Sequence, residues 1–289
     1  MKKSALLYIA LAGVFWGTSG IFSHYLRPYG FEAVQMTTIR GIVSMILMLS
    51  FVIITNPKLL KVSKKEIPFL LGSGIGLFAT ATAYYASMAA SSVSTAVILM
   101  YTAPVFVLIY SVLLLGEKFN TVKSISIFLM IVGCALVSGI VGGMKFSFWG
   151  IVWGVVSGLT YSAYNIFTKI LTMHKVHTLT VTGYNFIIMT VIGLCVSNPA
   201  EMVSFAAKAP AATIPLMIGL GVCTCILPYV FYTLGLRDIP AGTATALGII
   251  EPLAATVFSV AFLGEPLTIP LIIGMILVLG SVFALAKQE

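Results

Sequence analysis

Long, unbroken apolar runs constrain the fold of this chain more than any other feature of its sequence. Residues 42–54 and 269–286 contain no charged side chain. A β-barrel, the other structure that satisfies its backbone in lipid, needs polar and apolar residues in alternation. The continuous runs therefore indicate membrane-spanning helices. The composition agrees, because 8% of the residues are charged, whereas soluble domains have about 25%. This excludes a soluble single-domain enzyme, a disordered chain and a disulfide scaffold.

The breaks between the apolar runs set the number of spans. A helix needs about 20 residues to cross the hydrocarbon core of a bilayer, so 289 residues accommodate ten helices with short connections. The longest polar connection, 198–212, has room for a short interfacial helix. Ten is an even number, so both ends of the chain are expected on the same side. The predicted spans are 5–26, 33–54, 67–89, 94–115, 121–140, 148–169, 178–197, 213–235, 240–263 and 267–286.

The distribution of basic residues orients these spans. Lys and Arg collect in the cytoplasmic loops of membrane proteins. If the N-terminus is inside, 12 of the 16 basic residues fall in inside loops, Arg27, Lys145 and Lys208 fall outside, and Arg40 lies within a span. We therefore expect a multi-pass protein of the bacterial inner membrane with cytoplasmic N- and C-termini. Orientation and anionic lipid also account for the net charge of +8, so no nucleic-acid partner is expected.

The second half of the sequence repeats the first. An offset of 148 residues aligns 101–104 with 249–252, and the Leu-Gly-Glu of 115–117 with that of 263–265. The two copies are predicted to cover 1–141 and 148–289. Five spans per copy is an odd number, so the second copy enters the membrane from the opposite face. The sequence thus predicts an all-α integral membrane protein of ten transmembrane helices in two inverted five-helix repeats, an architecture of secondary transporters. A duplication kept only for packing is the alternative.

These repeated motifs resemble the EamA-type branch of the drug/metabolite transporter superfamily. The resemblance rests on Thr-Ala-Pro-Val at 102–105, Glu-Pro-Leu-Ala at 251–254, the two Leu-Gly-Glu motifs, and Thr-Ile-Arg-Gly at 38–41. It covers essentially the whole chain. It implies transport of small metabolites across bacterial inner membranes, often outward. It also implies a central cavity lined by the first, third, fourth, sixth, eighth and ninth spans.

Three ionisable side chains stand within predicted spans, and such groups are functional candidates because they are costly in lipid. Glu251, in the middle of the ninth span, is a candidate to bind a cationic group or carry a proton, or to hold helices together, neutral or paired with Arg40. Arg40 is expected to have an architectural role, bonded to carbonyls. His24, near the outer interface, has either a pH-linked gating role or no mechanistic role.

Aromatic and hydroxyl side chains form matched faces in the two copies. Trp16 and Ser19 lie three residues apart on the first span, as do their counterparts Tyr161 and Tyr164 on the sixth. Hydroxyls facing lipid would lack partners, so these faces should turn inward, where they suit a mostly apolar pocket. Helix packing through small polar residues is the alternative. The predicted hinges are Pro104, Pro228 and Pro252. The predicted substrate-binding residues are Trp16, Ser19, Tyr84, Tyr101, Tyr161, Tyr164, Asn165, Tyr229, Tyr232 and Glu251.

The sequence thus predicts a secondary transporter that moves a small amphipathic metabolite, such as an amino acid, an amine or a drug-like compound, outward by alternating access. A membrane receptor without transport, or a channel for a small molecule, is the alternative. An enzyme is not expected, because no catalytic constellation is present and the only aspartate, Asp238, lies in a loop. No cofactor or metal site is predicted. The expected partners are the substrate, the bilayer and protons as a candidate coupling ion, with monomer and homodimer both open.

Overall fold

A computed structural model describes residues 3–107, 109, 121–137, 147–236, 247–248 and 250–286. These described residues form helices joined by short connections and include no β-strand. The all-α class expected from the continuous apolar runs is confirmed for this part of the chain.

The helices follow one another along the chain with few long loops. The first half contains α1 (Lys3–Gly17), α2 (Ser19–Leu26), the 3-10 turn η1 (Arg27–Tyr29), α3 (Ala33–Thr55), the 3-10 turn η2 (Pro57–Leu60), α4 (Ile67–Ala90), α5 (Val93–Met100) and α7 (Thr121–Val137). The second half contains α8 (Phe148–Met173), α9 (Thr178–Val196), α10 (Pro199–Ala207), α11 (Pro210–Gly221), the π-helical turn η3 (Val222–Ile226), α12 (Leu227–Leu236), α14 (Ile250–Leu263) and α15 (Ile269–Ala286).

Five helical segments of the described chain are long and apolar enough to cross a membrane. Shorter apolar helices accompany them, namely Val93–Val107, Ser124–Val137, Ile250–Leu263 and Ile269–Ala284. The helix α8 has 26 residues, but Tyr161, Tyr164 and Asn165 lower its mean hydropathy. The five segments are Ser4–Tyr29, Ala33–Thr55, Ile67–Ala90, Thr178–Val196 and Pro210–Tyr232.

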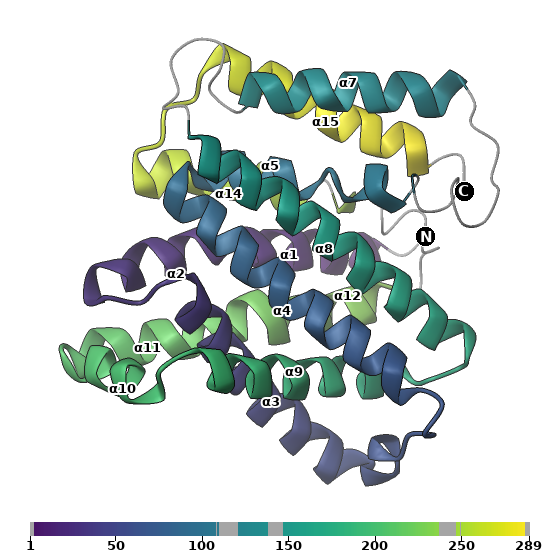
Figure 1. Ribbon diagram of the computed structural model, residues 1–289, viewed down its shortest axis with the longest axis vertical. Coiled ribbons are helices and arrows are strands. Elements are labelled where there is room, and N and C mark those ends of the chain that lie inside the picture. Colours follow the sequence, from purple (N-terminus) through teal and green to yellow (C-terminus); the bar gives the residue numbers. More distant parts are fainter. Residues whose placement is uncertain are drawn as a thin grey trace.

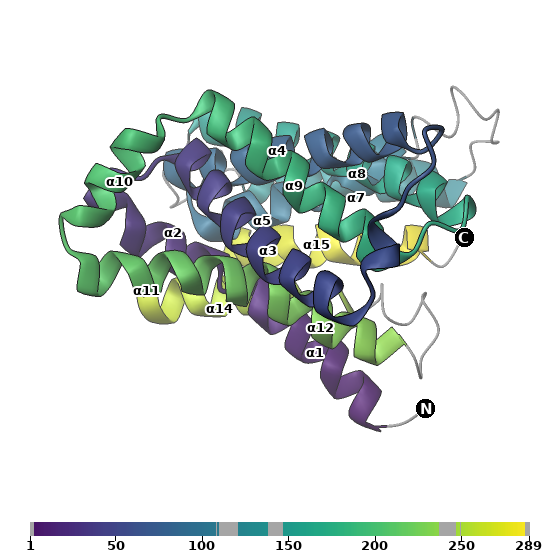
Figure 2. The same cartoon turned by 90° about the horizontal axis from the view of Figure 1, so that it is seen from below.

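Helices of the first half pack mainly against helices of the second half. The helix α4 packs along α8, and α1 packs along α12. In the same way, α5 packs on α8 while α1 packs on α14, and α3 packs on α9 while α7 packs on α15. Figure 1 shows α7 and α15 side by side at one edge of the bundle, with α3 and α9 at the opposite edge. Figure 2 views the bundle from the α3 side.

The contact between α7 and α15 depends on two glycines. A Cβ atom added to Gly133 would lie 2.8 Å from the carbonyl oxygen of Gly274, and one added to Gly274 would lie 2.7 Å from the carbonyl oxygen of Gly133. Both distances are far shorter than a van der Waals contact. The two helix backbones can therefore touch only because neither position carries a side chain.

Several helices expected to be continuous are interrupted. The first predicted span breaks at Thr18, whose hydroxyl donates to the carbonyl of Phe15 at 2.6 Å and so competes with the helical ladder. The fourth breaks at Tyr101 and Thr102, and helix resumes at residues 103–107, which include Pro104. The eighth is divided by the π-helical turn η3, which ends two residues before Pro228. Interruptions of this kind free backbone groups in the interior of the bundle.

The two ends of the described chain lie at the same end of the bundle. Figure 1 shows the start of α1 and the finish of α15 on the right, whereas α10 and the connection from α14 to α15 lie on the left. The short helix α10 occupies the connection in which an interfacial helix was expected.

Candidate substrate-binding site

The break after α5 meets the start of α14 at a backbone carbonyl that proline leaves without its helical donor. Pro252 has no N–H, so the carbonyl of Gly248, four residues earlier, cannot receive the usual helical hydrogen bond. The hydroxyl of Tyr101 donates to this carbonyl at 2.8 Å and to Oε2 of Glu251 at 3.1 Å. The N–H of Glu251 also donates to Gly248, at 3.1 Å. A side chain at the break next to α5 is thereby joined to the start of α14.

A second proline creates a similar arrangement between α3 and the turn η3. Pro228 leaves the carbonyl of Thr224 without its helical donor. Nη2 of Arg40 donates to that carbonyl at 3.0 Å, and Nε of Arg40 donates to Sγ of Cys225 at 2.8 Å. Within the described residues Arg40 makes no ion pair with Glu251, although the two charges lie within electrostatic range. Arg40 therefore links α3 to the π-helical turn through polar groups of that turn.

Aromatic side chains from three helices gather beside these two contacts. The ring of Trp16 on α1 lies edge-on to that of Tyr229, with centroids 6.0 Å apart, and 5.8 Å from that of Tyr232. The hydroxyls of Tyr164 and Tyr229 are 3.3 Å apart and join α8 to α12. The ring of Tyr161 stacks on that of Tyr164 at 5.8 Å. This region therefore presents hydroxyls as well as the faces and edges of aromatic rings.

We call the residues of this region the central cluster. They lie among the helices, yet each side chain is partly exposed, unlike the fully buried side chains of the apolar core. Asn165 belongs to it because its amide lies close to Tyr161, one helical turn earlier. The central cluster consists of Trp16, Tyr101, Tyr161, Tyr164, Asn165, Tyr229, Tyr232 and Glu251.

Tyr84 lies at the edge of the central cluster. It is 4% exposed and within electrostatic range of Glu251. Its hydroxyl is buried and has no hydrogen-bond partner in the part of the chain that the structure describes. A buried hydroxyl without a partner is uncommon in proteins. Tyr84 is therefore a polar group available to a bound molecule or to water.

Two predicted site residues lie apart from the central cluster. Ser19 is 3% exposed, and its hydroxyl donates to the carbonyl of Trp16 at 2.8 Å, within the same span. His24 is exposed at the end of α2, with its ring edge-on to that of Tyr25 at 5.2 Å. The structure brings neither side chain into contact with Glu251.

One prominent polar contact was not predicted as part of the site. Oε1 of Glu265 accepts from the N–H of Val93 at 2.6 Å, and Oε2 accepts from the N–H and the hydroxyl of Ser94, at 3.2 and 2.9 Å. The hydroxyls of Ser94 and Ser259 are 2.7 Å apart. We call this contact the Glu265 clamp. It fastens the first turn of α5 to the far end of α14, and its sequence signal was the repeated Leu-Gly-Glu motif.

The fold and the central cluster define the class of this chain, an all-helical membrane protein with polar and aromatic side chains gathered among its helices. In the described residues no three His, Cys, Asp or Glu side chains are close enough to hold a metal ion. The EamA-like transporter family matches residues 3–139 and again residues 148–286. The chain belongs to this family, and it is therefore a membrane transporter.

Relatives that match nearly the whole chain are also described as transporters. An uncharacterized transporter of Archaeoglobus fulgidus is 29% identical over 275 residues, which cover 95% of this chain and 93% of the relative. The uncharacterized inner membrane transporter YicL of Salmonella typhimurium is 23% identical over 99% of this chain and 96% of its own length. One solved crystal structure covers 100% of this chain and 99% of its own, with a TM-score of 0.63 at 16% identity. That likeness concerns the fold alone.

Proposed function

We propose that this chain is a secondary transporter of the bacterial inner membrane that moves a small amphipathic metabolite outward by alternating access. The observation that carries the proposal is the junction of Tyr101, Gly248 and Glu251. There, the break after α5 in the first half meets the start of α14 in the second half, within the bundle. Broken helices of this kind form the substrate sites of many transporters, since they offer free backbone groups where lipid cannot reach.

Ten spans in two inverted repeats, covering 1–141 and 148–289, are part of this proposal. The paired helix contacts support it, because exchanging the two halves reproduces the same set of neighbours. The two separate family matches also support it. Two halves that enter the membrane from opposite faces can open a shared site to either side at similar free energy. Pro104 and Pro228 lie beside helix interruptions and Pro252 lies near the start of α14, and these three are the proposed hinges.

The proposed substrate has an apolar body and one neutral, zwitterionic or weakly cationic polar end. The aromatic rings of the central cluster provide apolar walls. Tyr101 donates to one carboxylate oxygen of Glu251, and no described residue forms a hydrogen bond with the other oxygen, which can therefore accept from an amine. Both donors of Arg40 described above are engaged by η3, so Arg40 offers little to a phosphorylated substrate.

Binding and flux separate this proposal from its rivals. Purified protein is screened by thermal shift against amino acids, amines and cationic drug-like compounds, and each hit is tested for uptake into proteoliposomes. A transporter gives saturable flux and counterflow of the hit. Binding without flux would indicate a receptor, and currents too large for a carrier would indicate a channel; either result refutes the proposal.

Glu251 is the proposed route of any proton coupling. The variant Glu251→Gln keeps the shape of the side chain and removes its ability to ionise. We expect this variant to retain counterflow but to lose the response of transport to an imposed pH gradient. The matched control is Glu201→Gln, which alters an exposed glutamate on α10. A full pH-gradient response in Glu251→Gln would remove Glu251 from the coupling mechanism.

A further inference from the structure

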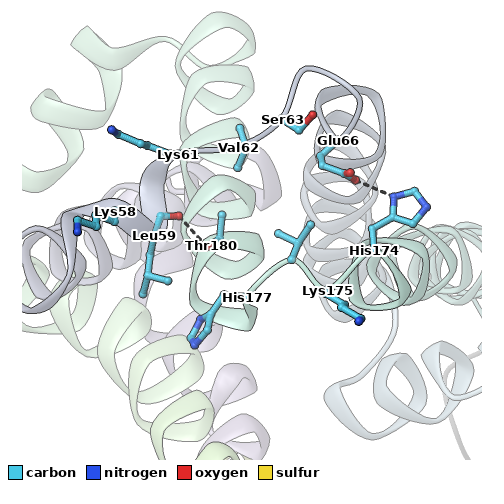
Figure 3. Close-up of a pocket in the computed structure, with 11 residues that line it drawn as sticks. Lys58, Leu59, Lys61, Val62, Ser63, Glu66, His174, Lys175, His177 and Thr180 are labelled. Atoms are coloured by element: carbon cyan, nitrogen blue, oxygen red, sulfur yellow. Dashed lines mark hydrogen bonds and ion pairs between the residues drawn. The ribbon is translucent and has the colours of Figure 1, made fainter.

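A pocket lies outside the central cluster, at the opposite end of the bundle from α10. It has a volume of about 260 Å³ and lies between η2 with its following loop, the start of α4, and the turn from α8 to α9. Figure 3 shows side chains from these segments around it, with Lys58 and Lys61 on one side and Lys175 on the other. The loops at this end are those in which basic residues collect.

The charge around this pocket is unbalanced. Lys58, Lys61 and Lys175 line it and are exposed, and within the described chain none of their ammonium groups makes an ion pair or a hydrogen bond. The only acidic side chain in the lining is Glu66, and its Oε2 is already 2.8 Å from Nδ1 of His174. Three lysine ammonium groups without a partner in the described chain therefore surround the pocket, and its one carboxylate already contacts a histidine.

Two backbone carbonyls of η2 next to this pocket are engaged by hydroxyls of α9. The hydroxyl of Thr180 donates to the carbonyl of Leu59 at 2.7 Å, and the hydroxyl of Tyr184 donates to the carbonyl of Leu60 at 2.8 Å. These bonds fix η2 on α9 and remove two acceptors that would repel an anion. With these two carbonyls engaged, the lysine ammonium groups are the main polar groups that face the pocket without a partner in the described chain, and they suit the oxygen atoms of a phosphate group.

The surroundings of the pocket indicate where that phosphate group comes from. Met173 directly precedes His174 and is 71% exposed, and Ile67 directly follows Glu66 and is 43% exposed. Ile54, at the end of α3, is 82% exposed. Exposed apolar side chains on the spans next to the pocket provide a surface for acyl chains. A phosphate carried by a lipid gains this contact, whereas a free phosphate does not.

We propose that the pocket between η2 and the α8–α9 turn binds the phosphate headgroup of an anionic phospholipid, with the acyl chains along the adjacent spans. Basic pockets between transmembrane helices are suited to such headgroups. This lipid site is separate from the central cluster and does not depend on which metabolite is transported.

The test compares two pairs of lysines from the same region. Lys61→Gln/Lys175→Gln removes two charges that line the pocket. Lys64→Gln/Lys65→Gln removes two charges from the same loop, at positions that do not line it. Thermal unfolding of the purified protein in detergent is followed as phosphatidylglycerol or phosphatidylcholine with the same acyl chains is added. Equal unfolding temperatures without lipid show that both variants fold.

We expect phosphatidylglycerol, and not phosphatidylcholine, to stabilise the native chain and the Lys64/Lys65 variant. In the Lys61/Lys175 variant, the half-maximal phosphatidylglycerol concentration should rise about tenfold or more, as for the loss of one charged hydrogen bond. Equal weakening in both variants would mean general surface attraction and overturn the proposal. Inorganic phosphate and glycerol phosphate are added in parallel to test the headgroup without acyl chains. If either protects as well as phosphatidylglycerol at the same concentration, the bound group is not a lipid and the proposal fails.

Discussion

In the proposed alternating-access cycle, the Glu265 clamp is the contact that must break when the bundle opens at the end that carries it. It joins α5 of the first half to α14 of the second, at the end opposite the start of α1. In Glu265→Gln the amide keeps one acceptor oxygen but loses the charge that faces the first turn of α5. The three hydrogen bonds of the clamp are no longer made to a charged group, and a weakening of about 0.7–1 kcal/mol each removes about 2–3 kcal/mol from the closed arrangement. The ratio of open to closed molecules should then rise about 30- to 150-fold.

A cysteine at position 19 reports this opening. Ser19 is 3% exposed. Its neighbour Gly20 packs so closely against Val93 that a Cβ added to Gly20 would come within 2.5 Å of that side chain. The native cysteines are first replaced by serine, and Ser19→Cys is then labelled in proteoliposomes with a membrane-impermeant maleimide. We expect Glu265→Gln to raise the labelling rate by a factor that approaches the change in population, and the control Glu201→Gln to leave it unchanged.

Hydrogen exchange distinguishes a contact that only holds the first turn of α5 in place from one that also controls access to the central cluster. Removing the carboxylate should accelerate exchange of the Val93 and Ser94 amides in either case, because both amides lose their acceptor. If those amides exchange faster while Ser19→Cys is labelled at its original rate, the clamp holds only the first turn of α5. That result would refute its role in access to the central cluster.

Three further predictions concern stability and the central cluster. Arg40→Met should destabilise the protein by about 1–3 kcal/mol, because the Thr224 carbonyl loses its donor, and thermal unfolding measures this. Gly133→Ala should cost about 1–3 kcal/mol by forcing α7 from α15, whereas Gly280→Ala, which meets nothing within 4 Å, should leave the unfolding temperature within error. Tyr101→Phe should lower substrate affinity in a thermal-shift titration about five- to tenfold, because the Glu251 carboxylate loses the hydroxyl that holds it in position. Unchanged affinity would place the substrate elsewhere.

The sequence contains enough to predict the class of fold, since continuous apolar runs allow only helices in lipid. It predicts helix continuity less well. The first predicted span, 5–26, is divided at Thr18 because a hydroxyl bonds the backbone of its own helix, and the eighth, 213–235, contains the π-helical turn before Pro228. Average hydropathy does not register such local hydrogen bonding. The helix α8 shows the converse, because the side chains that make it a site candidate also reduce its resemblance to a typical span.

The sequence also predicts which faces carry polar groups, but not which groups meet. Helical spacing is enough to place Trp16, Tyr161 and Tyr164 on inward faces. The partner of Arg40 depends instead on how α3 approaches η3, which is a tertiary property. The sequence left open both pairing with Glu251 and bonding to backbone carbonyls. The described structure has the second arrangement, with a cysteine as an additional acceptor.

The proline residues connect what the sequence predicts with what the tertiary structure adds. Its position in the sequence fixes which carbonyl loses a donor, since the affected residue is always four positions earlier. Pro228 and Pro252 therefore mark Thr224 and Gly248 by sequence position alone, whereas the donors, Arg40 and Tyr101, come from helices far away along the chain. Each donor lies in the first half and each freed carbonyl in the second. In the proposed alternating-access cycle, a movement between the halves must break or exchange these bonds. The proline sites would then set both the free energy of opening and the polar surface offered to the substrate.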